Sequence, residues 1–522
     1  MTSKKQADIL LVSNNIFAGK YGEDKPFPGI VAIVDNKIAA VGDIAQRDEW
    51  IGEDTEVYEL GDKVVCPGFS DNHVFFTGYV WKRIGADLSG ANTPAEAAKI
   101  LESFAKTLPD DKPVYGHGLN VDGWSDADKD AAILDKIFGA RAVIAYTPDR
   151  DFCWLNKAAQ ERYQITADEC WAEVSWRLFK EYLSDKKFAA REYKIFSDLL
   201  ASRGVTSIKE IGFDTYFGFA DILEDFEKKG QLKHRINLVS QPVGAPMNYE
   251  YGEECKKRFD SDFIRFMGYN VMVDGEICTQ TAAMIEPYEG KGDWKGDEVD
   301  YASIEKAVLE ADKRGMRCAL HAEGDAAVRG AVDIFEKCQK VNGKRDSRHA
   351  IIDLEMTHPE DLKRMGELGI SAINYFQIIQ TNDGFDGFYG EECVGKQRLS
   401  NYWAYKRMLE SGVNVCVGTD LPLSEPDIPL SLYFTVARKF LDGKPEGGFN
   451  KEQGITVAQT LRAWSAGGAY VNFMDKKLGT LEEGKLADIV VFDGDVFTAP
   501  IDEVPQIKVE MTICDGRLVY SK

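Results

Sequence analysis

The middle of the chain alternates short β-type runs with helical patterns, and this alternation restricts the fold more than any other feature of the sequence. The clearest apolar runs are 113–119, 141–147, 204–212, 234–240, 263–275, 316–324, 349–356, 369–376 and 413–420, with amphipathic segments such as 93–108, 301–315 and 359–369 between them. Alternating strands and helices at this density form a parallel sheet. Because the units outnumber what most open sheets need, we expect an α/β fold of the (β/α)8 TIM barrel type.

The two ends of the chain resemble each other and differ from the middle. Segment 29–43 reads as a β-hairpin, and segments 484–495 and 511–521 read as a strand and a second hairpin. Neither end is long enough to bury a sheet face alone. We therefore expect both termini, residues 1–65 and 476–522, to form one small composite β-sandwich domain, with the barrel and its insertions in residues 66–475.

Charge and composition exclude several classes of partner. The net charge is −23, whereas nucleic acids and anionic membranes require a basic surface. No run approaches the roughly 20 apolar residues of a membrane helix, and the N-terminus has no signal-peptide pattern. The ten cysteines are irregularly spaced, without a C-x-x-C pair, which predicts reduced thiols and a cytoplasmic protein. A small-molecule substrate remains the expected partner.

Metal-ligand and acid–base residues stand where several predicted strands end. His73 ends the run 64–74, and His321, Asp353 and Asp420 occupy the ends of three later runs. Alone, each of these side chains is more often a capping or hydrogen-bonding residue. The carboxyl ends of barrel strands converge in space, however, and four such residues together predict a site there.

Six blocks of the sequence resemble the amidohydrolase superfamily, in particular amidohydrolase family 3, the branch that contains N-substituted formamide deformylases. They occur in the family's order and cover nearly the whole chain: 66–79 (CPGFSDNHVFFTGY), 271–288 (VMVDGEICTQTAAMIEPY), 320–336 (LHAEGDAAVRGAVDIFE), 348–362 (RHAIIDLEMTHPEDL), 415–430 (VCVGTDLPLSEPDIPL) and 479–493 (GTLEEGKLADIVVFD). The resemblance implies a metal-dependent hydrolase in which one or two divalent cations lie at the mouth of the barrel.

The chain departs from the family's ligand pattern of two histidines in H-x-H, a lysine, two further histidines and an aspartate. Phe75 stands in place of the second histidine and Asn270 in place of the metal-bridging lysine. Phenylalanine cannot coordinate a cation and asparagine cannot be carboxylated, so a two-metal site of the usual kind is not expected. Asp353 replaces the fourth histidine, and Asp151 replaces a histidine of a further block.

The ligand set implied by the resemblance is therefore His73, His321, Asp353 and Asp420, which suffices for one divalent metal with an open position. Carboxylate in place of imidazole makes the site harder, so manganese and iron(II) join zinc as candidates. Asp420 is the implied general base, and we take it and His321 as the catalytic residues. Asp353 as the base is an alternative that the sequence leaves open.

Other polar residues are expected to line the substrate pocket: His117, Asp151, Lys209, Asn270 and Tyr375. Three histidines are excluded from the site. His234 and His349 precede strands and belong at the far face of the barrel, and His358 belongs to a predicted capping box that begins at Thr357.

Three functions stay open at this point. The family default is hydrolysis of an amide or cyclic amide C–N bond by a metal-activated water. The altered ligands also allow hydrolytic C–C ring opening of a cyclic β-diketone, whose two oxygens can chelate one metal. A non-catalytic relative that only binds metal or ligand is the third alternative. A homodimer is expected from the resemblance alone.

Overall fold

The computed structural model describes residues 6–147, 152–166, 182–212, 219–242, 245–382 and 384–522, and the chain divides into two compact units. The first unit contains Met1–Val74, Ser197–Asp214 and Phe226–Lys522, and the second contains Phe75–Phe196 and Thr215–Asp225. Each unit is described by itself. No helix among the described residues is long and apolar enough to cross a membrane.

The first unit is built around a sheet of eight parallel strands that follow one another in chain order. The strands are β6 (Phe69–Val74), β11 (Val205–Gly212), β12 (Arg235–Ser240), β13 (Ile264–Met272), β14 (Arg317–Ala322), β15 (Ala350–Asp353), β16 (Ser371–Asn374) and β17 (Val415–Val417). Val74, the last residue of β6, and Leu421, beyond β17, form a parallel bridge that brings the two sheet edges together. The predicted (β/α)8 barrel is confirmed.

Helices follow the strands of this unit: α10 (Tyr249–Arg258), α11 (Tyr301–Lys313), α12 (Asp325–Asn342), α13 (Pro359–Leu368), α14 (Gly390–Val394), α15 (Tyr405–Glu410), α16 (Ile428–Ala437), α17 (Val457–Arg462) and α18 (Gly468–Val471). Helix α13 shows how local sequence sets the boundaries. Pro359 occupies its first turn and Gly369 ends it with φ 70°. The N-cap is His358, whose side chain accepts a hydrogen bond from the Glu360 N–H. The predicted assignment of His358 to the helix cap is therefore confirmed, whereas the capping box predicted to begin at Thr357 is wrong.

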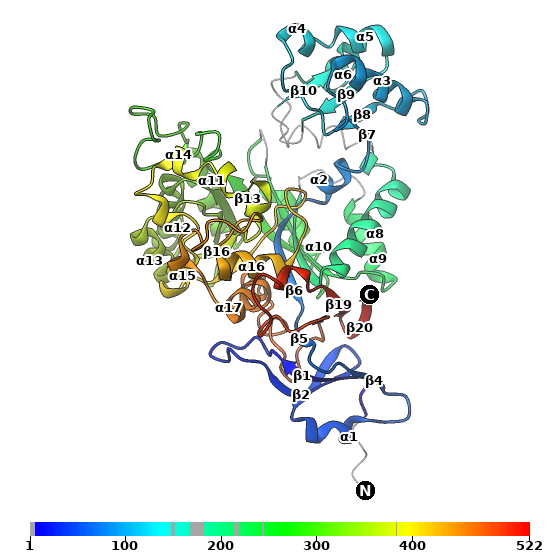
Figure 1. The fold of residues 1–522 in the computed structure, drawn as a ribbon, viewed down its shortest axis with the longest axis vertical. Helices are drawn as coiled ribbons and strands as arrows, with labels where there is room; N and C mark the ends of the chain where they lie inside the picture. Colours follow the sequence, from blue (N-terminus) through cyan, green and yellow to red (C-terminus); the bar gives the residue numbers. More distant parts are fainter. Residues whose placement is uncertain (1–5, 148–151, 167–181, 213–218, 243–244, 383) are drawn as a thin grey trace. The chain divides into compact units, whose positions relative to one another are not determined.

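Strands from both chain ends form one further sheet in the first unit. Its members are β1 (Ile9–Ile16), β2 (Phe27–Val34), β3 (Lys37–Gly42), β4 (Glu56–Glu59), β5 (Val64–Pro67), β18 (Ile489–Phe492), β19 (Val509–Cys514) and β20 (Arg517–Ser521), with the short helix α1 (Arg47–Trp50) between β3 and β4. Strand β18 pairs antiparallel with β5, so the blue and red ends of the chain meet here (Figure 1). Both predicted hairpins are present, whereas the exact domain boundaries stay a prediction.

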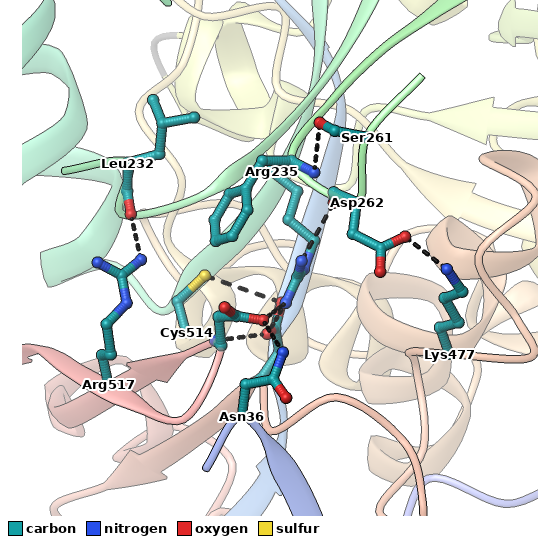
Figure 2. Close-up of polar contacts among 11 residues, drawn as sticks. Asn36, Leu232, Arg235, Ser261, Asp262, Lys477, Cys514 and Arg517 are labelled. Atoms are coloured by element: carbon teal, nitrogen blue, oxygen red, sulfur yellow. Dashed lines mark hydrogen bonds and ion pairs between the residues drawn. The ribbon is translucent and has the colours of Figure 1, made fainter. Parts of the chain in front are cut away.

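A buried arginine joins the barrel to this terminal sheet (Figure 2). Arg235, the first residue of β12, donates from Nε and Nη2 to the two carboxylate oxygens of Asp488 at 3.0 and 2.8 Å. Its Nη2 also contacts Asp515 Oδ1 at 3.0 Å, and its Nη1 donates to the Asp262 carbonyl at 3.1 Å. Because a planar guanidinium matches a carboxylate bidentately, these bonds fix the direction in which the terminal sheet attaches.

The second unit has its own sheet, in the order β10 (Cys153–Leu155), β9 (Val143–Tyr146), β8 (Val114–His117) and β7 (Ala86–Asp87). Helices α2 (Phe76–Trp81), α3 (Pro94–Ala105), α4 (Asp126–Lys129), α5 (Ala132–Phe138) and α6 (Lys157–Tyr163) belong to it, and α8 (Lys186–Ser202) and α9 (Phe219–Lys228) cross the unit boundaries. The runs 113–119 and 141–147 thus form strands outside the barrel. Cys153 is disulfide-bonded, which corrects the expectation of reduced thiols, whereas eight other cysteines among the described residues are free.

Candidate active site

His73 and Asp420 lie together where the first and last barrel strands meet. His73 Nε2 is 3.6 Å from Asp420 Oδ1, and the Asp420 N–H donates to the His73 carbonyl at 2.9 Å. Burial, followed by the charges of Lys209 and His321, lowers the pKa of His73 well below its ordinary value. The imidazole is therefore neutral near pH 7, which is the form that coordinates a cation.

A buried carboxylate holds the loop that carries Asp420. Asp71 on β6 accepts from the Thr419 N–H at 3.0 Å and from the Thr419 hydroxyl at 2.5 Å. Asp420 itself has φ 53°, a left-handed conformation that is uncommon for a residue with a side chain. Asp71 thus acts as a positioning residue that sequence reasoning missed, although it stands two residues before His73 on the same face of its strand.

His321 and Asp353 form the second pair, on the neighbouring strands β14 and β15. His321 Nε2 is 3.4 Å from Asp353 Oδ2, and both side chains are almost fully buried. Burial by itself would lower the pKa of His321, but the hydrogen bond and charge of Asp353, with the charge of Asp420, raise it. Asp353 has φ 78°, so both aspartates of the site sit in strained backbone of the kind that concentrates at functional sites.

Tyr375 links the two pairs. Its ring centroid is 5.6 Å from that of His73 and 6.3 Å from that of His321, and the two histidine rings are 6.2 Å apart. The Tyr375 hydroxyl is buried and has no hydrogen-bond partner among the described residues. Burial and the charges of Asp420 and Asp353 raise its pKa well above the ordinary value, so it stays a proton donor.

Two glutamates that sequence reasoning missed extend the site. Glu323 follows His321 by two residues and Glu355 follows Asp353 by two, and each stands just beyond the end of its strand. Glu323 accepts from the Ile277 N–H at 2.9 Å, and Glu355 accepts from the Tyr402 hydroxyl at 2.5 Å. Burial and the charge of Asp353 raise the pKa of Glu355 to about 8. In the sequence, only the H-x-E and D-x-E spacings could have indicated these two glutamates as members of the site.

Lys209 and Asn270 are buried on β11 and β13, two barrel strands that β12 separates. Lys209 on β11 has no partner for Nζ among the described residues, and burial, followed by the charge of Arg317, lowers its pKa well below the ordinary value. Asn270 on β13 donates to Gln241 Oε1 at 2.7 Å. Asn270 pairs with Ala319 of β14, which stands two residues before His321. Among the described residues, Asn270 forms no hydrogen bond with any of the four predicted metal ligands.

Two further predicted substrate contacts, His117 and Asp151, do not belong to the described part of the first unit. His117 ends β8 in the second unit, where it is partly exposed and burial lowers its pKa. Asp151 lies outside the described residues.

The histidines excluded from the site occupy structural positions. The Cys318 N–H donates to His349 Nδ1 at 3.0 Å, so Nε2 carries the proton that it shares with Asp312 Oδ1 at 3.0 Å. His234 Nδ1 contacts the Ser197 hydroxyl at 3.3 Å, and burial lowers its pKa to about 3. Both precede strands, as expected.

The donors at this end of the barrel fit a divalent cation. His321, Glu323 and Asp353 present ligand atoms that all lie within 4.8 Å of one another. Nδ1 of the buried His321 has no partner among the described residues. Two imidazoles and several carboxylates form the mixed nitrogen and oxygen set that zinc, manganese and iron(II) accept.

Comparisons with known proteins show the family to which the chain belongs. A model of the amidohydrolase family matches residues 56–520. The putative amidohydrolase YtcJ of Bacillus subtilis is 22% identical over 94% of this chain and 96% of its own length. The N-substituted formamide deformylase of Arthrobacter pascens is 23% identical over 42% of this chain and 40% of its own. Among solved structures, an uncharacterized metal-dependent hydrolase from Pyrococcus horikoshii superposes with a TM-score of 0.75 at 19% identity, covering 95% of this chain and 99% of that one.

Proposed function

Because the chain belongs to the amidohydrolase family of hydrolases, we propose that it cleaves an amide or cyclic amide C–N bond of a small molecule at one divalent metal. His73, His321, Asp353 and Asp420 hold the metal in this proposal. The observation that carries it is the convergence of these four side chains, from strands β6, β14 and β15 and the segment after β17, at one end of the barrel.

The bound metal would polarise the substrate carbonyl and lower the pKa of a bound water to about 7. Zinc and manganese are the first candidates, with iron(II) as a third.

Asp420 is the proposed general base, because it is the ligand that solvent and substrate can reach. Its side chain is 28% exposed, whereas that of Asp353 is 7% exposed. A base must approach the proton that it accepts within hydrogen-bond distance. Asp420 then returns this proton to the departing nitrogen. His321 orients the opposite side of the site through its contact with Asp353.

Tyr375 is the proposed donor to the substrate. Its hydroxyl has no partner among the described residues, and its ring lies near both histidine rings, with centroids 5.6 and 6.3 Å away. A donor placed there can stabilise the charge that develops on a carbonyl oxygen during attack. Lys209, Asn270, His117 and Asp151 stay predicted substrate contacts. The cytoplasmic location and the homodimer also stay predictions.

Metal analysis combined with a substrate panel tests this proposal. Protein purified without chelator should contain about one divalent metal per chain, and hydrolysis of N-formyl amines or cyclic amides should disappear with chelator and return with zinc or manganese. Cyclic β-diketones form a separate arm of the panel. Turnover of diketones alone would replace C–N by C–C cleavage. A metal-free protein, or an Asp420→Asn variant with unchanged kcat, would contradict the proposed chemistry.

A further inference from the structure

Two compact sets of three potential ligands are present among the described residues. One is His321, Glu323 and Asp353 at the active end of the barrel, and the other is Asp312, Cys338 and His349. In each set, all three ligand atoms lie within 4.8 Å of one another. The two sets therefore have similar dimensions, and their surroundings decide which one can bind a cation.

The donors of the Asp312 set already have partners inside the protein. Both ring nitrogens of His349 form hydrogen bonds, one with the Cys318 N–H and one with Asp312. Arg345 Nε contacts Asp312 Oδ1 at 2.9 Å, and Asn342 donates to Oδ2 at 2.8 Å. Because a guanidinium neutralises this carboxylate, the set is a structural network and not a cation site.

The donors of the His321 set remain largely available. Glu323 accepts one backbone N–H, that of Ile277, and no lysine or arginine contacts Glu323 or Asp353 within the described part of the chain. Buried carboxylates without a cationic partner are unfavourable unless a cation is supplied. His321 Nδ1 and the Tyr375 hydroxyl, both on side chains more than nine-tenths buried, also lack partners among the described residues.

The backbone around Glu323 is fixed on both sides. Its N–H and that of Gly324 donate to the two oxygens of Asp274 at 3.1 and 3.0 Å. Its carbonyl accepts from the Met356 N–H at 3.0 Å. The Glu323 carboxylate is thus presented beside His321 from a rigid segment, which is the support that a metal ligand needs.

We infer that Glu323 is a further protein ligand of the metal, so that the cation is held by His321, Glu323 and Asp353 on one side and by His73 and Asp420 on the other. This inference rests on the proposed function, because it concerns the same metal. A third carboxylate makes the set harder and favours Mn²⁺ relative to Zn²⁺ more than the four predicted ligands would.

The test measures the affinity of the purified apoprotein for Zn²⁺ and Mn²⁺ alone, by competition with a chelating dye, in four proteins: wild type, Glu323→Gln, Glu323→Asp and Glu355→Gln. Glu355 is the matched control because it is a buried carboxyl of the same cluster that two tyrosine hydroxyls already satisfy. We expect Glu323→Gln to weaken binding at least about tenfold, more for Mn²⁺ than for Zn²⁺, and Glu355→Gln to weaken it clearly less.

Glu323→Asp retains the charge but withdraws the carboxylate by one methylene, so it separates ligation from a general electrostatic effect. A weaker affinity and an altered absorption spectrum of bound Co²⁺ support ligation, and this comparison serves also if Glu323→Gln fails to fold. If the wild type binds metal and the Glu323 variants match it, or match Glu355→Gln, the inference is overturned while the proposed function stands. If the wild type binds no metal, the proposed function falls, and the inference with it.

Discussion

Arg235 holds Asp488 through two parallel hydrogen bonds, and this pair connects the first residue of a barrel strand to the sheet formed by the chain termini. Both side chains are almost completely buried, at 3% and 4% exposure. Replacing one partner leaves the other charge buried and unpaired. We expect Arg235→Ala to lower the free energy of unfolding by about 3–5 kcal/mol, measured by urea denaturation.

The same region offers a control for this prediction. Lys477 and Asp262 form an ion pair of 2.6 Å, but their side chains are about half exposed (53% and 43%) (Figure 2). Exposed pairs contribute about 0–1 kcal/mol, so Lys477→Ala should have a small effect. The apolar double variant Arg235→Met with Asp488→Leu should be more stable than Arg235→Ala. If Arg235→Ala and Lys477→Ala lowered the free energy of unfolding equally, burial would not determine the contribution of an ion pair in this region.

Gly418 allows the last barrel strand to approach the first. A Cβ at this position would lie 2.6 Å from the His73 Cβ, which is shorter than the non-bonded contacts that Cβ atoms make in proteins. Gly418→Ala should therefore cost about 1–3 kcal/mol and displace His73, with a loss of metal affinity. Gly447→Ala, where a Cβ meets open space, is the matched control and should change stability by less than about 0.5 kcal/mol. Unchanged metal binding in Gly418→Ala would mean that the imidazole position tolerates this strain.

The strand pattern predicted the barrel because each of the eight barrel strands lies within an apolar run of the sequence. It did not predict which sheet each run would join. Segments 113–119 and 141–147 have the same composition as barrel strands, yet β8 and β9 form a separate sheet in the second unit. Strand pairing is decided by tertiary contacts, which local periodicity does not report.

The candidate site was predictable where a residue stands at a strand end. His73, His321, Asp353 and Asp420 were singled out in this way, and the structure brings them close to one another, while their role as ligands stays a prediction. Glu323 and Glu355 were missed because they follow the strand ends and resemble ordinary loop acids in sequence. Only their spacing of two residues from His321 and Asp353 could have indicated them.

Asp312 should make the protein sensitive to acid. Burial alone would raise the pKa of this carboxyl, but hydrogen bonds from His349 and Asn342 and the charges of His349 and Arg345 lower it to about 2 from an ordinary value of 3.8. A lowered pKa in the folded state contributes stability above pH 4 that is lost as the pH falls toward 2. The contribution is about 2 kcal/mol.

The measurement for Asp312 is the free energy of unfolding of the wild type and of Asp312→Asn between pH 4.5 and 2.5. The variant should be less stable at pH 4.5 and should lose less stability across this range, because its side chain does not titrate. Parallel curves for the two proteins would contradict the assignment. Lys363→Ala, which removes an exposed surface pair with Glu367, should leave the wild-type slope unchanged.

Tyr375 provides the sharpest test of the substrate side of the site. Its hydroxyl is buried without a partner among the described residues, so Tyr375→Phe removes a group that does not stabilise the fold, and the free energy of unfolding should change by less than about 1 kcal/mol. If the hydroxyl donates to the substrate, kcat/KM should fall about tenfold, the equivalent of one hydrogen bond, while metal affinity stays the same.

Tyr405→Phe is the control, because this hydroxyl is also buried and unpartnered in the described part of the chain but its ring packs on Phe376. A wild-type kcat/KM in Tyr375→Phe would remove this tyrosine from the catalytic account, and an equal loss in Tyr405→Phe would trace the effect to packing instead of substrate contact.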